Sequence, residues 1–312
     1  VDGRSPQTAV GQQVRSVLTD GRPAAADERL LVPRRVPHDA AVFLKEAGYE
    51  LQSTPALVTA RSSKTPAERD RIRAVQTAAT TGVARAEAVL AASEPAADGL
   101  VFEDEPLSAA RLARLVNSEL AAAGVSPAAN TTVDAGIAPD DTAPDDALPA
   151  GVPIRLGVAP RGPAGYHGHL VRTVVVDSDG GWERRAFVAA AAGLEAAVDQ
   201  AAPGVDVAAV ASEAAAEVGA YGFAPPDAES GRSRSTVAAH GVGLSTHEPP
   251  VRGRGEGGLR PGSVIAVSAG VADPDHGTVR LGTLCSVTDS GADRLVDSPT
   301  SLSPADRRDS TD

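Results

Sequence analysis

The sequence predicts an α+β fold in which helices are segregated from a largely antiparallel sheet. Two observations predict it: helical stretches occur in two pairs, and each pair is followed by short apolar runs typical of strands. The order helix, helix, strands therefore occurs twice between residues 64 and 300, which indicates two duplicated halves. Hydrophobic residues make up 42% of the 312 residues but aromatic residues only 3%, so the core should consist of Ala, Val and Leu.

The first 63 residues predict too little structure for an independent core. They contain a strand-like run at 30–32, a helical run at 37–48, and a strand followed by a turn at 49–58.

The larger part begins with a helix predicted at residues 65–92. Thr65 is suited to the N-cap, Pro66 to the first helical position, and Glu68 completes a capping box. The elements expected after it are a helix at 107–123, strands at 131–134, 152–158 and 169–176, helices at 182–201 and 206–220, and strands at 235–244, 263–269, 277–287 and 293–296. Residues 301–312 are expected to be a polar tail.

The charge balance excludes two classes of partner. There are 29 basic and 41 acidic residues, a net charge of -12, which argues against nucleic acid and against anionic membrane surfaces. Lys45 and Lys64 are the only lysines, and this arginine-rich, aspartate-rich composition favours a high-GC genome and a salt-rich cytoplasm, as in halophilic archaea. The single cysteine, Cys285, allows no intrachain disulfide, and there is no apolar run near 18 residues. We therefore expect a cytoplasmic protein, with Cys285 as a buried apolar residue.

Five motifs follow one another in a fixed order. They are KTPAE at 64–68 with IR at 72–73, GYHGHLVRT at 165–173, HGVGL at 240–244 with HEPP at 247–250, LRPG at 259–262 with IAV at 265–267, and VRL at 279–281. Together they resemble the pita-bread metallopeptidases, which include Xaa-Pro aminopeptidases, prolidases, methionine aminopeptidases and the metal-free creatinase. The resemblance implies a pita-bread peptidase-like domain at 64–300 and a shortened remnant of an N-terminal domain at 1–63.

The resemblance also implies a ligand set for two divalent metals: two Asp, one His and two Glu. Carried over by position, the two Asp fall on Arg155 and His169, the His on His240, and the two Glu on Ser268 and Gly282. Four of these five ligands are thus replaced, one of them by a cation. Hard divalent cations need oxygen ligands, and Arg155 would repel them, so we expect no metal cofactor.

The rim of the same pocket departs from the family as well. Asp145 falls where the family usually has a substrate-binding His, and an Arg155–Asp145 ion pair is expected, with Asp146 and Glu248 as further candidate partners. The alternative is that Arg155 faces an open pocket and binds an anionic ligand such as a peptide carboxylate. We favour the internal pair.

The histidines allow three interpretations. His240 and His247 could form a metal-free acid/base pair as in creatinase, because the imidazole pKa lies near operating pH. They could instead be retained only because the turn that carries them is structural, which we favour. His167 and His169 would share a strand face and could join His240 in a three-histidine zinc site, against which Arg155 counts.

The sequence thus predicts an Xaa-Pro aminopeptidase-like protein that is inactive as a metal-dependent peptidase. We expect it to bind a peptide, a protein or an active paralogue in the old cleft, with a homodimer as a further arrangement. The alternative is a metal-independent amide or guanidino hydrolase that uses His240 and His247.

Overall fold

The computed structural model describes residues 29–136, 143–225, 233–251 and 258–304, and the chain divides into two compact units at residues 1–61 and 62–312. The described part contains no helix that is both long and apolar enough to cross a membrane. We describe the two units separately.

The small unit is a parallel strand pair with a helix in the connection. Its elements are β1 (Arg29–Pro33), α2 (His38–Glu46), β2 (Glu50–Thr54) and α3 (Ala56–Ser62), whose last residue lies at the unit boundary. Of the strand and turn predicted at 49–58, the strand is confirmed as β2. The turn is wrong, because α3 starts directly after β2. The Thr54 hydroxyl accepts a hydrogen bond from the Ala56 amide at 3.1 Å, and Pro55, which has no amide hydrogen, suits a helix start.

The large unit contains the two predicted halves. The elements of the first half are α4 (Pro66–Ala91), β3 (Glu94–Ala96), β4 (Gly99–Phe102), β5 (Glu105–Pro106), α5 (Ala109–Ala122), β6 (Thr131–Ala135), β7 (Ile154–Val158) and β8 (Leu170–Val174). Those of the second half are α6 (Trp182–Gln200), α7 (Val207–Ala220), β9 (Arg234–Gly241), β10 (Glu248–Val251), β11 (Val264–Asp273), β12 (Gly277–Val287) and β13 (Ala292–Arg294).

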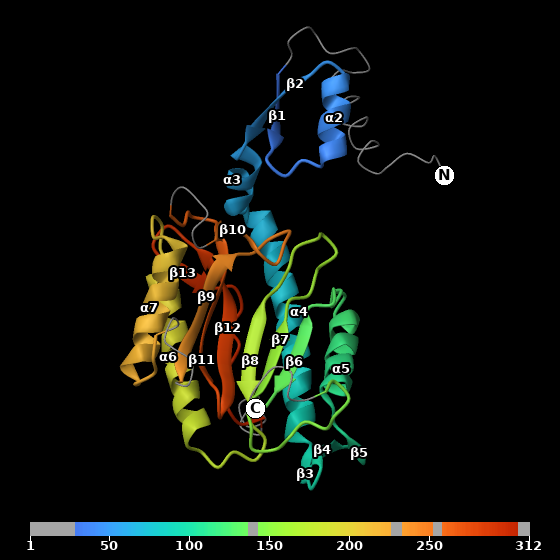
Figure 1. The fold of residues 1–312 in the computed structure, drawn as a ribbon, viewed down its shortest axis with the longest axis vertical. Helices are drawn as coiled ribbons and strands as arrows, with labels where there is room; N and C mark the ends of the chain where they lie inside the picture. The colour runs from blue at the N-terminus through green and yellow to red at the C-terminus, as the bar shows by residue number, and fades with distance from the viewer. Residues whose placement is uncertain (1–28, 137–142, 226–232, 252–257, 305–312) are drawn as a thin grey trace, which may run out of the picture. The chain divides into compact units, whose positions relative to one another are not determined.

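One sheet joins the two halves. Its strand order is β10-β9-β11-β12-β8-β7-β6, with β13 on β12, and all of these pairings are antiparallel. Figure 1 shows α4 and α5 beside the strands of the first half, and α6 and α7 beside those of the second. The predicted α+β architecture is confirmed.

A small three-stranded sheet, β3–β4–β5, was not predicted. The strands β4 and β5 are joined by Glu103 and Asp104, which both have positive φ (54° and 61°), as a two-residue hairpin loop requires. Both side chains are exposed.

The helix start predicted at Thr65 is confirmed. The Thr65 hydroxyl accepts from the Glu68 amide at 3.3 Å, and Oε2 of Glu68 accepts from the Thr65 amide at 2.8 Å. Oε1 of the same carboxylate accepts from the Tyr166 hydroxyl at 2.7 Å. This hydrogen bond, with the Thr65 amide second, holds the pKa of Glu68 below its ordinary value.

Each half has a core of small aliphatic side chains. Alanine and valine dominate the core of the second half, and Leu, Val and Ala that of the first, as the composition predicts. A glycine lets the two helices approach closely in each half. A Cβ atom on Gly82 would lie 2.8 Å from Leu120 of α5, and one on Gly193 would lie 2.7 Å from Val218 of α7. Cys285 is buried in the second core, and burial raises its pKa to about 12.

Candidate functional site

The two faces of the large sheet have different partners. Side chains at every second position of β7, β11 and β12, such as Leu156, Val267 and Leu281, pack into the cores beneath the helices. Because strand residues alternate between faces, the residues between them lie on the other face. We call it the helix-free face because α5, α6 and α7 pack on the opposite side, although Ile72 at the start of α4 clusters there with Val264, Ala266 and Leu284. Ser268 lies opposite Gly282 on β12, and Gly282 lies opposite Val171 on β8.

The five positions that the resemblance singled out meet on this helix-free face. Arg155 is opposite Thr173, which is two residues from Val171, so it shares the face of Gly282. His240 is two residues from Ala238, which is opposite Ser268. His169 lies just before β8, and its ring centroid is 5.9 Å from that of His240.

Arg155 has a different partner from the one predicted. Its Nη2 and Nε donate to Oδ2 of Asp134 at 2.6 and 3.2 Å, and the two residues are register partners on β7 and β6. The side chains are 27% and 31% exposed, so the pair is partly screened by solvent. The expected Arg155–Asp145 pair is wrong, because Asp145 is exposed in a local turn.

Asp146 and Glu248 are not partners of Arg155 either. Oδ2 of Asp146 accepts from the Ala143 amide at 3.2 Å, which closes the turn locally. Oε1 of Glu248 lies 2.7 Å from Nζ of Lys64, and both side chains are almost fully buried. Glu248 therefore belongs to the packing between the helix start and the His240 turn.

Three histidine rings form a contiguous group. The rings of His240 and His247 stack with centroids 3.9 Å apart and an interplanar angle of 11°, and His169 meets His240 edge-on. The His169 backbone is fixed by Gln76, whose amide nitrogen donates to its carbonyl and whose amide oxygen accepts from its N–H, both at 2.9 Å. Nε2 of His240 lies 3.2 Å from the Thr246 carbonyl, to which it can only donate.

The surroundings keep two of these imidazoles neutral. Burial lowers the pKa of His169 to about 3, assisted by the positive charges of His240, Arg280 and His247. Burial and His247 lower the pKa of His240 to about 4, although the hydrogen bond to Thr246 opposes the shift. At neutral pH both rings are therefore uncharged.

Arg280, which lies in the VRL motif at 279–281, completes the group, and the sequence did not single it out as a site residue. Its Nη2 and Nε donate to the Ser268 hydroxyl oxygen at 2.7 and 3.1 Å. The side chain is half-buried, and no carboxylate of the described residues forms an ion pair with it. Burial, and secondly the charge of Arg155, lowers the pKa of Arg280. We call His169, His240, His247, Ser268 and Arg280 the histidine–arginine cluster.

His167 does not join this cluster. It is buried, its amide donates to the Gly243 carbonyl at 2.9 Å, and its Nδ1 lies 3.5 Å from the Ala159 carbonyl. Over the described ranges, no three or more His, Cys, Asp and Glu side chains are grouped so that they could hold a metal ion. The three-histidine zinc site is thus not formed by His167, His169 and His240.

The donor set does not fit two divalent metals. The five positions of the resemblance offer two imidazoles, a hydroxyl already bonded to Arg280, a glycine, and a guanidinium paired with Asp134. Hard divalent cations prefer several carboxylate oxygens, and none of the five positions supplies one.

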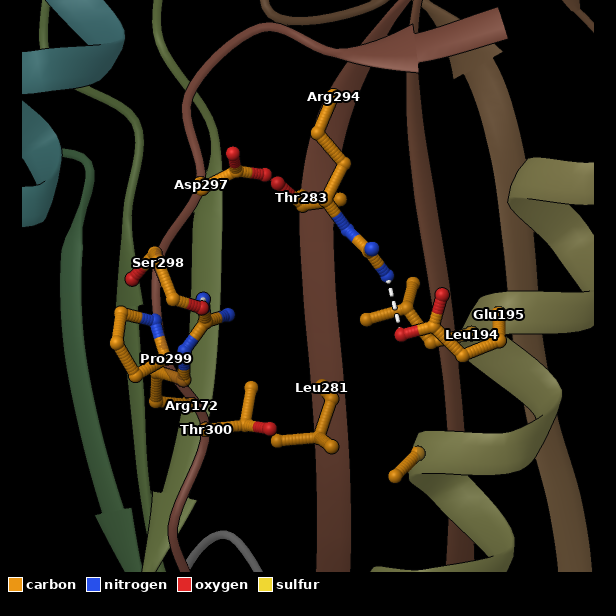
Figure 2. A pocket seen from close by; sticks show the side chains of 11 residues that line it. Arg172, Leu194, Glu195, Leu281, Thr283, Arg294, Asp297, Ser298, Pro299 and Thr300 are labelled. Carbon is orange, nitrogen blue, oxygen red and sulfur yellow. Dashed lines mark hydrogen bonds and ion pairs between the residues drawn. The ribbon is translucent and has the colours of Figure 1, made fainter.

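A separate pocket of about 290 Å³ lies on the helix-covered face (Figure 2). It is bordered by β12, α6 and residues 297–300, and contains none of the predicted site residues. The Arg294 guanidinium is held there by Glu195 at 2.7 Å, and Arg172 donates to the Ser298 carbonyl at 3.1 Å. The first contact joins β13 to α6, and the second joins residues 297–300 to β8.

Known proteins resemble this chain in sequence and in fold. Residues 68–289 match metallopeptidase family M24. Xaa-Pro dipeptidases from Pyrococcus horikoshii and Pyrococcus furiosus are each 30% identical over 132 residues, which is 42% of this chain but only 36% of either relative.

Solved structures extend the similarity to nearly the whole chain. The prolidase from Pyrococcus furiosus has a TM-score of 0.72 at 22% identity, over 92% of this chain and 79% of its own. The X-Pro aminopeptidase from Thermotoga maritima has a TM-score of 0.75 at 16% identity, over 97% and 80%. These low identities show the fold alone. The family match spans well over half of the residues, so the chain belongs to metallopeptidase family M24 and has its pita-bread fold.

Proposed function

We propose that this chain is an Xaa-Pro peptidase-like protein that has lost the family's dimetal centre and binds peptide without cleaving it. The observation that carries the proposal is the Arg155–Asp134 ion pair, with Nη2 and Oδ2 at 2.6 Å. Arg155 stands where the resemblance implies a metal-binding aspartate. Its guanidinium also forms an ion pair with Asp134, so that carboxylate is not available to a metal. A divalent cation at this point would be repelled by the positive charge of Arg155 at short range.

The remaining positions support the same conclusion. Ser268 accepts two hydrogen bonds from Arg280, which brings a second positive charge to the helix-free face. Gly282 has no side-chain donor at all. His169 and His240 are the only ring donors left, and two imidazoles without a carboxylate are a poor site for hard divalent ions.

The alternative, a metal-independent hydrolase, is supported less well. General acid/base catalysis works best when the pKa lies near the operating pH, whereas the pKa of His240 is about 4. Nε2 of His240 is engaged by the Thr246 carbonyl, and His247 stacks on the ring instead of donating to it. In the described part of the chain no carboxylate contacts either ring, and Ser268 is bonded to Arg280 instead of to a histidine.

The proposed ligand is a short peptide, a segment of another protein, or an active paralogue that presents such a segment. Peptide binding should depend on the helix-free face and not on the helices behind it. Ala238, which is half-buried opposite Ser268, offers a place to obstruct that face. Val188 on α6 is 46% exposed and offers a matched control among the helices.

Equilibrium dialysis with a library of labelled Xaa-Pro peptides in the presence of Mn²⁺, followed by chromatography of the recovered peptide, tests the proposal. We expect bound peptide to be recovered intact, Ala238→Arg to abolish binding, and Val188→Arg to leave it unchanged. Release of the N-terminal residue by the wild-type chain, lost on addition of a chelator, would overturn the proposal.

A further inference from the structure

We infer that Arg280 and Ser268 form a carboxylate-binding site, and that this site recognises an acidic group of the peptide ligand. The inference rests on the proposed function and specifies the chemistry of its ligand. It starts from the charge balance of the helix-free face.

The charges there do not cancel. Arg155 is neutralised by Asp134, with which it shares two hydrogen bonds. Arg280 is half-buried, yet its guanidinium donates only to a neutral hydroxyl among the described residues. A partly desolvated charge without a counter-charge is unfavourable, so an anion at this point would be stabilised. Asp134 is already paired with Arg155 and does not neutralise Arg280, so the described residues of this face carry an excess of one positive charge.

The hydrogen-bonding groups left unused by Arg280 and Ser268 are donors, which suit the acceptor oxygens of an anion. Nε and Nη2 of Arg280 both donate to Oγ of Ser268, so the serine oxygen acts as acceptor twice and its own hydrogen is directed elsewhere. Nη1 of Arg280 forms no hydrogen bond to a described residue. A guanidinium N–H and a hydroxyl O–H, adjacent in space, are suited to the two oxygens of one carboxylate.

The neighbours add positive potential and solvent access. His169 lies close enough for the charge of Arg280 to lower its pKa, and Arg155 has the same effect on Arg280. Arg280, His169 and Arg155 are all half-buried, so a ligand can reach them from solvent.

A monoanion fits this site better than phosphate does. One carboxylate cancels the one uncompensated charge. A phosphate dianion would leave a negative excess beside the Asp134 carboxylate, which stands close to Arg155. The carboxylate could be the C-terminus of a peptide or an Asp or Glu side chain, and binding measurements separate these two sources.

Isothermal titration calorimetry tests the inference with four probes: a tripeptide with a free C-terminus, the same tripeptide as its C-terminal amide, an amidated tripeptide that contains Asp, and inorganic phosphate. We expect the free acid or the Asp peptide to bind about ten to one hundred times more tightly than the neutral amide, the range for a charge-assisted hydrogen bond. Which of the two binds more tightly identifies the source of the carboxylate.

Substitutions test whether Arg280 and Ser268 cause the preference for an acidic peptide. Arg280→Gln should make the affinity for the preferred acidic peptide equal to that for the neutral amide. Arg114→Gln, the same change at an exposed position of α5, should preserve the preference for the acidic peptide. If Arg280→Gln does not fold, Arg280→Lys and Ser268→Ala replace it, and each should reduce the preference several-fold.

The possible failures are distinguishable. Equal affinity for the neutral amide, the free acid and the Asp peptide overturns the carboxylate site and leaves peptide binding intact, and tighter binding of phosphate than of either acid also overturns it. If N-acetylglycine, added as a fifth probe, binds through Arg280 while no tripeptide binds, the carboxylate site holds and the proposed peptide-binding function is wrong.

Discussion

Asp134 and Arg155 face each other across the β6–β7 strand pair, with Oδ2 and Nη2 2.6 Å apart. The two residues are 21 positions apart in sequence, and the ion pair joins the edge strand β6 to the face that carries the histidine–arginine cluster. It places a paired cation where the resemblance implies a metal-binding carboxylate.

Removing the acid of this pair should destabilise the fold moderately. We expect Asp134→Ala to lower the free energy of unfolding by about 1–3 kcal/mol, less than for a fully buried pair because both side chains are partly exposed. Asp145→Ala, in the exposed turn, is the matched control and should change it by less than about 0.5 kcal/mol. Urea denaturation of both variants measures the difference. Equal effects would show that Asp134 is not the principal partner.

The buried Lys64–Glu248 pair should be far more sensitive. Its Nζ–Oε1 distance is 2.7 Å, and the side chains are only 2% and 6% exposed. Either Lys64→Met or Glu248→Leu alone leaves one buried charge and should cost about 3–5 kcal/mol of unfolding free energy. The double variant removes both charges and should recover most of that loss. Additive losses in this double-mutant cycle would contradict the coupling.

Acid should destabilise the large unit through His169 and His240. Their folded-state pKa values of about 3 and 4 lie below the ordinary value of 6.5, so the unfolded chain binds more protons between these limits. The free energy of unfolding should therefore fall as pH decreases from 6.5 towards 4, and it should be highest above that window. His169→Gln removes one of these protonation differences. Urea denaturation at several pH values should show a shallower fall for this variant, and identical slopes would disagree with a lowered pKa of His169.

Restoring the implied ligand list tests whether the positions were assigned correctly. We expect the combined Arg155→Asp, His169→Asp, Ser268→Glu and Gly282→Glu variant to regain part of its metal binding, seen as a melting temperature that rises with Mn²⁺. The structure adds a constraint: a Cβ atom on Gly282 would lie 3.0 Å from Cβ of Ser268 and 3.3 Å from Cβ of Val171. The variant should therefore be less stable than the wild type without metal. A folded variant whose melting temperature does not change with Mn²⁺ would show that these positions are not equivalent to the family's ligands.

The sequence predicted the fold, the capping box at Thr65 and the duplicated halves because these depend on local periodicity and on motif order. It did not predict the partner of Arg155, because the register between β6 and β7 is set by contacts between distant segments. The residues next to Arg155 in the sequence do not indicate that register. Loop position favours Asp145, but the turn that contains it is closed by Asp146.

Arg280 was overlooked for a different reason. It enters only as part of the VRL motif at 279–281, although its position two residues before Gly282 on a strand already indicates the same face. The helix α3 was missed because its start depends on the Thr54 hydroxyl and on Pro55, in a run that otherwise resembles a strand.

Metal stoichiometry tests the central claim most directly. The full chain should be saturated with Mn²⁺, Co²⁺ or Zn²⁺, freed of excess ion by gel filtration, and analysed by inductively coupled plasma mass spectrometry. With four of the implied ligands replaced, we predict less than about one equivalent of metal per chain and a melting temperature that a chelator does not change. Two equivalents per chain, together with a melting temperature that falls on chelation, would contradict the loss of the dimetal centre.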